Sequence, residues 1–455
     1  MANTRIGRTV SSAGSRRKAT FSAWVKRTGL GEAWIAKFGG DYSQGNFMQI
    51  GFDSSDSCFI VGDIPSASNP RMQSTRKFRD TNAWYHYVVA FDTEQSTASD
   101  RLKFYINGEQ VTSFGTATYP TLNLDLGFNR TGTYNNAWLG GRGESTYEFS
   151  GLMSHVHWCD GYVYDASAFG ETDATTGEWK IKTSPSVTYG TNGYFMLKDG
   201  NSLTDASGNN NNFSSLVGTL TKTEDCPSNV FATVNPLWFN SSTFTNGNLT
   251  VAGGSAHRPN IPTLATSSGK YYFEAKMISG NTNKWWLGYA DQEYLDSRQN
   301  LTSNIDLGGG NISGGVNQKN GAVTAGWGNQ LQQSPISAIT NFFSSAGAAN
   351  DIMAMAIDLD NQKIWWSLNG TWRNGSATAS TTFNASYPDS TNLDAGRNYY
   401  LCCGSENSKW SVNYGNGYFG TTAVSSAGTN ASGNGIFEYD CPAGFTALST
   451  KGLNL

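Results

Sequence analysis

The sequence predicts an all-β protein built from two antiparallel β-sandwiches in tandem. The chain has 455 residues, which is too long for one sandwich and fits two with connecting segments. It contains 52 Gly, 14 Trp, 21 Tyr and 24 Phe, and it is rich in Ser, Thr and Asn. Aromatic and turn-forming residues in such numbers are typical of many short strands joined by tight turns.

The first strands are predicted from alternating apolar and polar side chains. Residues 20–26 place Phe21, Ala23 and Val25 on one face, as in a half-buried strand. Asn107-Gly108 directly follows an aromatic strand and indicates a hairpin. The other strands predicted in this half lie at residues 33–38, 47–52, 84–91, 101–106, 109–112, 137–140 and 147–158.

The order of these strands resembles a known family. The segments FSAWVKR, WYHYVVAFD, LKFYINGEQV, WLGGRGE and YEFSGLMSHVHWCDG resemble the laminin-G-like or concanavalin-A-like jelly rolls. The positions that match are Trp84, His86, Asn107, Gly108, Gly140, Gly141, Phe149 and Gly151. The resemblance implies a concanavalin-A-like sandwich, to which we assign residues 19–220.

Residues 1–18 precede this sandwich and carry five basic side chains in a Ser- and Gly-containing stretch. No apolar core follows them, so they do not form a secretory signal peptide. We predict a flexible basic arm, with an arm that docks on an assembly as the alternative.

A connector at residues 221–246 follows the first sandwich. The segment TEDCPSNVFATVNPL is predicted to be an extended linker restrained by Pro227 and Pro236. Together with the preceding GTNGYF and DASGNNNNF, it resembles a connector of structural proteins of tailed phages, particularly marine ones. This resemblance implies a virion protein.

The second sandwich is assigned to residues 247–455. Strands are predicted at residues 244–250, 270–277, 284–289, 351–358 and 363–368, the last turning at Asn369-Gly370. The segments SGKYYFEAKM, WWLGYAD, DIMAMAIDLDNQKIWWSLNGTW and FEYDCPAGFTAL resemble a SPRY domain. The match departs from the family pattern at Asn350, where the family has Gly, and at Trp366, which takes the aromatic place of the hairpin.

Several functions are disfavoured by the sequence. The formal net charge of −4 provides no basic field for nucleic acid, and no apolar run is long enough to insert in a membrane. The acidic strand of concanavalin-like glycanases, which supplies two carboxylates, is missing, so we expect no enzymatic activity and no catalytic residue. His155 and His157 lack a nearby acidic cluster, and the cysteines lack zinc spacing, so we expect no metal and no cofactor.

Tryptophans are the candidate ligand-binding residues. In Trp285-Trp286 and Trp365-Trp366, alternation directs one ring to the core and the other outward or into a second layer. We favour an aromatic core as the explanation, with an exposed ring as the alternative. An exposed Trp ring can stack on a sugar or a partner protein. The candidates are Trp34, Trp286, Trp327, Trp366 and Trp372.

These observations together predict a non-enzymatic virion structural protein of a phage. We expect a tail fibre, receptor-binding or tail-associated adhesion component that binds host-surface glycan or neighbouring virion proteins, as a homo-oligomer with a trimer as one form. A capsid decoration or head-fibre protein is the first alternative, and a polysaccharide-degrading enzyme is the second.

Overall fold

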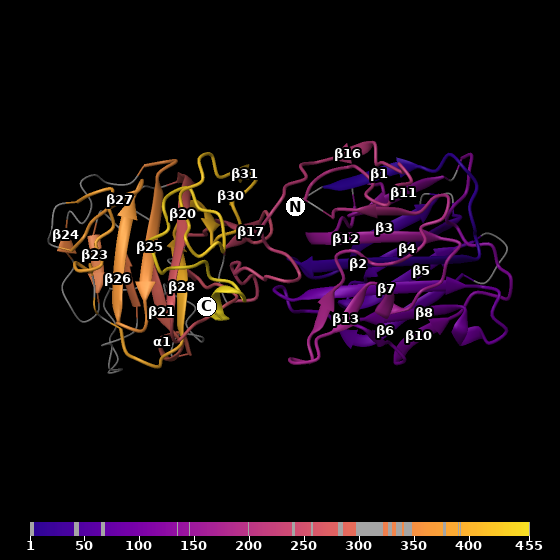
Figure 1. Ribbon diagram of the computed structural model, residues 1–455, viewed down its shortest axis with the longest axis horizontal. Coiled ribbons are helices and arrows are strands. Elements are labelled where there is room, and N and C mark those ends of the chain that lie inside the picture. The colour runs from indigo at the N-terminus through magenta and orange to yellow at the C-terminus, as the bar shows by residue number, and fades with distance from the viewer. Residues whose placement is uncertain are drawn as a thin grey trace. The chain divides into compact units, whose positions relative to one another are not determined.

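The chain folds into two compact units. The computed structural model describes all residues except 1–3, 41–44, 65–68, 134, 145, 199, 239–241, 256–257, 281–284, 297–321, 326–329, 334–338, 341–347, 376–378, 390, 392 and 455. The first unit holds Met1–Lys222 and Cys226–Ser228, and the second holds Thr223–Asp225 and Asn229–Leu455. Each is an antiparallel β-sandwich (Figure 1), which confirms the predicted fold class.

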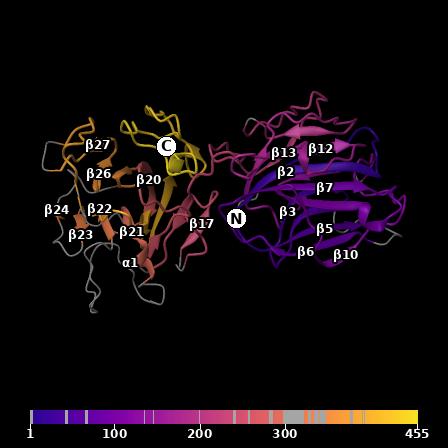
Figure 2. The same cartoon turned by 60° about the horizontal axis from the view of Figure 1, so that its bottom comes forward.

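Two sheets form the first unit, and Figure 2 shows them as two layers. The eight-stranded sheet has the order β10 (Phe114–Thr118), β6 (Arg71–Lys77), β5 (Ser57–Asp63), β4 (Phe47–Phe52), β3 (Ala33–Gly39), β11 (Asn136–Leu139), β1 (Arg5–Thr9) and β16 (Ser215–Val217). The six-stranded sheet has the order β15 (Tyr194–Met196), β12 (Gly151–Asp160), β2 (Lys18–Arg27), β7 (Trp84–Asp92), β8 (Leu102–Ile106) and β9 (Glu109–Gln110). Short 3₁₀ turns lie at Ala98–Asp100 and Ala166–Ala168.

The main core of the first unit lies between these sheets. Phe21, Ala23 and Val25 of β2 all face it, as the alternation predicts. The predicted hairpin joins β8 to β9, with φ of 48° at Asn107 and 86° at Gly108. Positive φ at both central residues is the geometry that an Asn-Gly turn supplies between antiparallel strands.

The opposite face of the six-stranded sheet is also covered. A hairpin of β13 (Gly170–Thr172) and β14 (Trp179–Ile181) belongs to the segment that packs there as a second small core. Trp179 donates from Nε1 to Nδ1 of His86, 3.0 Å away, so His86 donates from Nε2 to the hydroxyl of Ser22 at 2.9 Å. Burial lowers the pKa of His86 to about 3, and the ring is therefore neutral.

The prediction of a flexible arm at residues 1–18 is wrong. Residues Arg5–Thr9 form β1, which pairs with β11 on one side and β16 on the other. Arg5 forms an ion pair of 2.8 Å with Glu148, 143 positions later in the chain. Arg8 donates to the side chain of Asn211 at 2.7 Å. Distant partners therefore order a segment whose composition alone indicates an unstructured terminus.

Two sheets also form the second unit. The seven-stranded sheet has the order β17 (Thr243–Thr245), β18 (Thr250–Ala252), β29 (Ser408–Asn413), β20 (Lys270–Gly280), β25 (Ile352–Asp358), β26 (Lys363–Leu368) and β27 (Thr371–Trp372). The six-stranded sheet has the order β19 (Arg258–Asn260), β28 (Tyr399–Ser405), β21 (Trp285–Asp291), β22 (Ala322–Ala325), β23 (Gln330–Gln333) and β24 (Ile339–Thr340). The remaining elements are β30 (Tyr418–Phe419), β31 (Thr422–Ala423), helix α1 (Gln292–Asp296) and a 3₁₀ turn at Gly452–Asn454.

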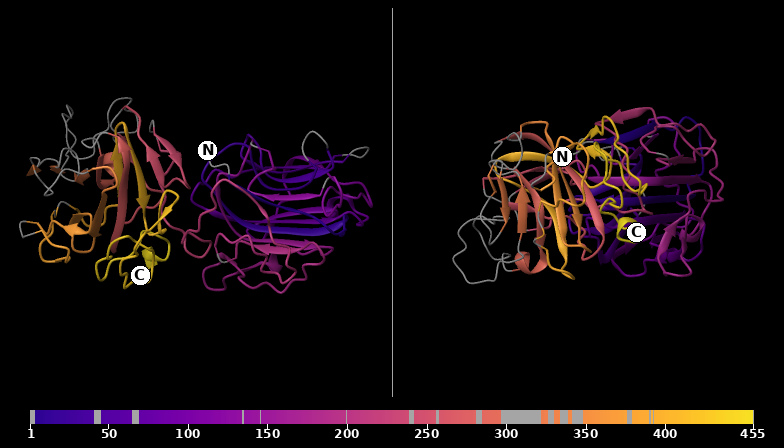
Figure 3. Two further views of the ribbon diagram at one scale, coloured as in Figure 1. Left: turned by 90° about the horizontal axis from the view of Figure 1, so that it is seen from above. Right: turned by 60° about the vertical axis from the view of Figure 1, so that its left-hand side comes forward.

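The seven-stranded sheet of the second unit is buried on both faces. Phe273 and Trp366 face the core between the sheets. Tyr272 and Trp365 face the opposite side, where Phe437 and other residues of the C-terminal segment, yellow in Figure 3, pack over them. The two rings of Trp365-Trp366 therefore face opposite sides as predicted, one in the core and one in a second layer, and neither is the exposed ring that ligand binding would need.

The predicted linker at residues 221–246 is also partly incorporated in the second unit. Phe231 and Val234 are buried, and Ala232 donates its N–H to the carbonyl of Leu448 at 2.9 Å. Strand β17 also begins inside the predicted range. An extended segment here completes the fold because its backbone pairs with the C-terminal segment.

Candidate functional site

The structure buries the candidate tryptophans that it describes. The exposed fractions of Trp34, Trp366 and Trp372 are 3%, 0% and 4%. Trp366 lies in the core and donates from Nε1 to the carbonyl of Leu287 at 3.1 Å. Trp372 packs on the ring of Phe383, with 5.0 Å between centroids. The expectation of exposed rings is therefore wrong for these residues, while the side chain of Trp286 and all of Trp327 lie outside the described residues.

Trp34 nevertheless belongs to a face with polar and aromatic side chains. We call it the outer face: the surface of the eight-stranded sheet that points away from the main core. Each of its residues has a sequence neighbour in the main core, so strand alternation directs its own side chain outward. The outer face comprises Arg5, Gly7, Trp34, Lys37, Gln49, Phe59, Arg71 and Trp138.

Strand register brings these residues together in a row. Gly7 pairs with Trp138, Trp138 with Lys37, and Lys37 with Gln49. The row crosses β1, β11, β3 and β4. Since paired residues on neighbouring strands lie about 5 Å apart, the four positions form one continuous strip.

Trp138 lies flat against the sheet because its neighbours are glycines. A Cβ atom at Gly7 would lie 2.5 Å from the indole ring, and one at Gly143 would lie 2.7 Å from Nε1. The guanidinium of Arg5 lies 5.7 Å from the ring centroid. The ring is half-buried. Only glycine at position 7 leaves room for this orientation.

Tyr147 is an exposed aromatic residue in the segment between β11 and β12. Its exposed fraction is 47%, and the guanidinium of Arg142 lies 4.9 Å from the ring centroid. Its carbonyl accepts the N–H of Trp34 at 3.0 Å. The next residue, Glu148, forms the ion pair with Arg5, in which both side chains are buried. The ring of Trp138 thus lies near the guanidinium of this pair, and Tyr147 directly precedes its carboxylate in the sequence.

A second group of outer-face residues lies on β3, β5 and β6. The rings of Trp34 and Phe59 are 5.7 Å apart, and the guanidinium of Arg71 lies 4.6 Å from the centroid of Phe59. Trp34 donates from Nε1 to Glu32 at 3.2 Å. The two packed rings therefore support Arg71, whose own side chain is exposed.

Gln49 is the unusual polar residue of the outer face. It is 0% exposed, and neither atom of its amide hydrogen-bonds to any part of the chain that the structure describes. A buried amide without a partner costs about 1–3 kcal/mol. Such groups are rare in native folds, so Gln49 is a candidate functional residue.

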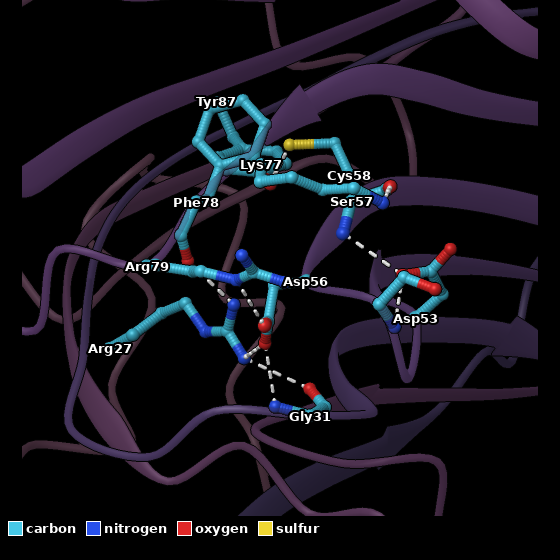
Figure 4. A network of polar contacts seen from close by, with 11 residues as sticks. Arg27, Gly31, Asp53, Asp56, Ser57, Cys58, Lys77, Phe78, Arg79 and Tyr87 are labelled. Atoms are coloured by element: carbon cyan, nitrogen blue, oxygen red, sulfur yellow. Dashed lines mark hydrogen bonds and ion pairs between the residues drawn. The ribbon is translucent and has the colours of Figure 1, made fainter. Parts of the chain in front are cut away.

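A buried ion pair fixes the loops at one end of the same sheet (Figure 4). Arg27 donates to Asp56 at 3.1 Å and to the carbonyls of Phe78 and Gly31 at 2.7 and 2.9 Å. Asp56 also accepts the N–H of Gly31 at 2.7 Å and Nε of Arg79 at 3.0 Å. Burial raises the pKa of Asp56, but the donors at Gly31, Arg79 and Arg27 outweigh it and lower the pKa overall. The network is structural because it joins three loops.

The histidine pair does not form a metal centre with the residues around it. The pairing of β12 shifts register between Ser154 and His157, and His155 has φ of 48°. His157 is buried beside Tyr189, whose hydroxyl lies 3.0 Å from Nδ1. Across the described part of the chain, no group of three or more His, Cys, Asp or Glu side chains is close enough to hold a metal ion.

Sequence patterns alone did not indicate Trp138, Tyr147, Arg71 or Gln49 as site residues. Lys37 and Gln49 each interrupt an apolar strand with a polar side chain, and this signal could have identified the outer face. Tyr147 falls in a segment predicted to be strand, so its exposure and its φ of 60° were not foreseeable.

No helix in the described part of the chain is long and apolar enough to span a membrane.

Comparisons with known proteins place the first unit in a class. Residues 7–167 match the family described as the concanavalin A-like lectin/glucanases superfamily. The first unit therefore has a lectin-like sandwich fold. No curated protein matches the sequence significantly.

Solved structures with similar folds include three of different origin. The SPRY domain of human HERC1 is 13% identical, with a TM-score of 0.26, over 39% of this chain and 96% of that one. Domains LG4-5 of the mouse laminin alpha1 chain are 9% identical, with a TM-score of 0.30, over 97% and 92%. The CBM40 of Ruminococcus gnavus IT-sialidase is 13% identical, with a TM-score of 0.26, over 36% and 94%.

Proposed function

We propose that the protein is a non-enzymatic structural component of a phage particle that binds host-surface glycan through the outer face of its first unit. The observation that carries this proposal is the half-buried ring of Trp138 against Arg5 of the Arg5–Glu148 ion pair, with the exposed ring of Tyr147 held by Arg142 in the same segment that contains Glu148. The C–H face of a sugar ring packs on aromatic rings, and its hydroxyls bond to fixed charged groups. The family match, which includes lectins, supports a binding role.

The virion part of the proposal rests on the connector. Its resemblance to phage structural proteins favours a tail fibre, receptor-binding or adhesion role, with the second unit contacting other virion proteins and the chain assembling as a homo-oligomer. Cryo-electron microscopy of the particle tests this location. Density at the tail supports host attachment, regular density over the shell supports the capsid decoration or head-fibre alternative, and absence from any particle refutes a virion role.

Glycan binding is tested with the full chain on a glycan array, followed by calorimetric titration of the best ligand. Replacing Trp138 or Tyr147 with alanine should weaken binding about tenfold or more, since aromatic anchors dominate such interfaces. Tyr387→Ala is the matched control, because Tyr387 is 49% exposed and belongs to the second unit. Unchanged affinity in both the Trp138→Ala and the Tyr147→Ala variants would refute the site.

The same titrations test the absence of catalysis. Glu148 is paired with Arg5, and Glu32 accepts a hydrogen bond from Trp34. Both carboxylates therefore have structural partners, which supports binding without turnover. We expect the bound glycan to be recovered intact. Release of new reducing ends over hours would instead favour the polysaccharide-degrading alternative.

A further inference from the structure

We propose that the outer face selects sugars that carry an anionic group, a carboxylate or a sulfate, and that Arg71 binds this anion. This inference rests on the proposed glycan-binding function and specifies its ligand class. Three observations support it: the ion pairing of the arginines on and beside this face, the aromatic rings that contact Arg71, and the buried amide of Gln49.

Arg71 differs from Arg5 and Arg142 in its charge partners. Arg5 is paired with Glu148 at 2.8 Å, and Arg142 with Glu144 at 3.2 Å. Arg71 forms no ion pair with any residue that the structure describes, and its side chain is exposed. Its positive charge is therefore available to a ligand, whereas the other two guanidinium groups are already neutralised locally.

Aromatic packing holds Arg71 in place. Its guanidinium lies 4.6 Å from the centroid of Phe59, which packs in turn against Trp34. Stacking uses the flat face of a guanidinium and leaves the N–H groups at its edge free. Those groups form a planar fork that matches a carboxylate or sulfate with two parallel hydrogen bonds. A stacked arginine also loses less conformational freedom on binding than a mobile one.

Gln49 supplies an independent observation on the same sheet, on β4. It pairs with Val61, and Val61 pairs with Arg71, so Gln49 and Arg71 lie on one row two strands apart, about 10 Å. Its amide is fully buried and has no hydrogen-bond partner among the described residues. The amide therefore marks a polar group on this face that the described chain does not satisfy.

The experiment compares acidic glycans with neutralised counterparts. The full chain is titrated with a uronic-acid-containing and a sulfated oligosaccharide, and with the same molecules after carboxyl reduction or desulfation. We expect acidic ligands to bind at least tenfold more tightly than their neutral forms. The arm with the larger difference identifies whether the anion is a carboxylate or a sulfate.

Arg71→Gln should weaken the binding of acidic sugars about tenfold or more and so remove this preference. Arg76→Gln is the matched control, since Arg76 lies on the same strand, is exposed, stacks on Phe78 at 5.2 Å, and changes the net charge equally. Arg71→Lys keeps the charge without the planar fork and should lose most of the preference.

Three outcomes would overturn the inference. Equal binding of acidic and neutral sugars, with no effect of Arg71→Gln, refutes the anion site while the glycan-binding function stands. An equal loss in Arg71→Gln and Arg76→Gln indicates unspecific attraction and also refutes it. Failure of every glycan to bind refutes the proposed function itself.

Discussion

Replacing Asp56 with alanine should lower the free energy of unfolding of the first unit by about 3–5 kcal/mol, because it leaves the guanidinium of Arg27 buried without its carboxylate. The side chain of Arg27 is 0% exposed and that of Asp56 is 8% exposed. Urea denaturation checks this value, and hydrogen exchange of peptides from residues 28–56 identifies the unit that is affected.

Arg79→Ala is the control for this effect. Arg79 contacts the same carboxylate at 3.0 Å, but its side chain is 61% exposed, so its loss should cost less than about 1 kcal/mol. The lowered pKa of Asp56 also sets a pH dependence. Its contribution to stability is present above the ordinary pKa of an aspartate and is lost as the pH falls through the lower value in the folded state. Equal destabilisation by both variants would contradict a dominant buried pair.

Replacing Glu274 with alanine should destabilise the second unit by about 3–5 kcal/mol, because several buried donors lose their acceptor. Glu274 is 0% exposed and accepts the N–H groups of Glu438 and Tyr439, each at 2.9 Å. Tyr272 donates its hydroxyl at 3.0 Å, and Asn413 donates its amide at 3.2 Å. The carboxyl group therefore attaches the C-terminal segment to β20. Loss of exchange protection at residues 437–449, measured by mass spectrometry, checks this result.

The contribution of Glu274 to stability should depend on pH with the opposite sign to that of Asp56. Burial raises the pKa of Glu274 from 4.5 to about 7, although the N–H groups of Glu438 and Tyr439 oppose the shift. The folded state thus holds the proton more tightly, so stability is complete below pH 4.5 and falls as the pH rises toward 7. The loss is on the order of 3 kcal/mol. Urea midpoints between pH 4.5 and 8 should show this slope, and Glu274→Ala should flatten it. A flat profile in the unmodified protein would refute the assignment.

Local patterns were sufficient to predict strands, hairpins and their inward faces. Phe21, Ala23 and Val25 face the main core, and both Asn-Gly turns have positive φ. These features depend on a few neighbouring residues, so they can be inferred from sequence. The sandwich class follows from the number and spacing of such strands.

What covers the second face of a sheet could not be inferred in this way. Alternation directs Cys402 and Cys403 to opposite faces of β28, and both are 0% exposed because each face packs into its own apolar cluster. Trp365 and Trp366 are buried for the same reason. Covering segments come from distant parts of the chain and have little periodicity of their own.

The candidate site was only partly predictable. Trp34 lies on the outer face, but its ring is buried. It packs against Phe59 and does not offer an exposed ring to a ligand. Trp138 and Arg71 become neighbours of one surface only through the register of several strands. Registers between strands far apart in sequence are set by the whole sheet, so no local pattern contains them.

Strand β1 has a consequence for biosynthesis. Its partners are β11 and β16, and β16 ends at Val217. Strand β1 is therefore synthesised early in its unit, whereas its second partner is synthesised late. Pairings of such long range slow folding, and an unpaired strand edge favours misassembly. On the ribosome, the first unit should stay incomplete until β16, more than 200 residues after β1, has emerged. Chaperone occupancy of nascent chains should therefore persist until β16 has emerged and fall soon afterwards.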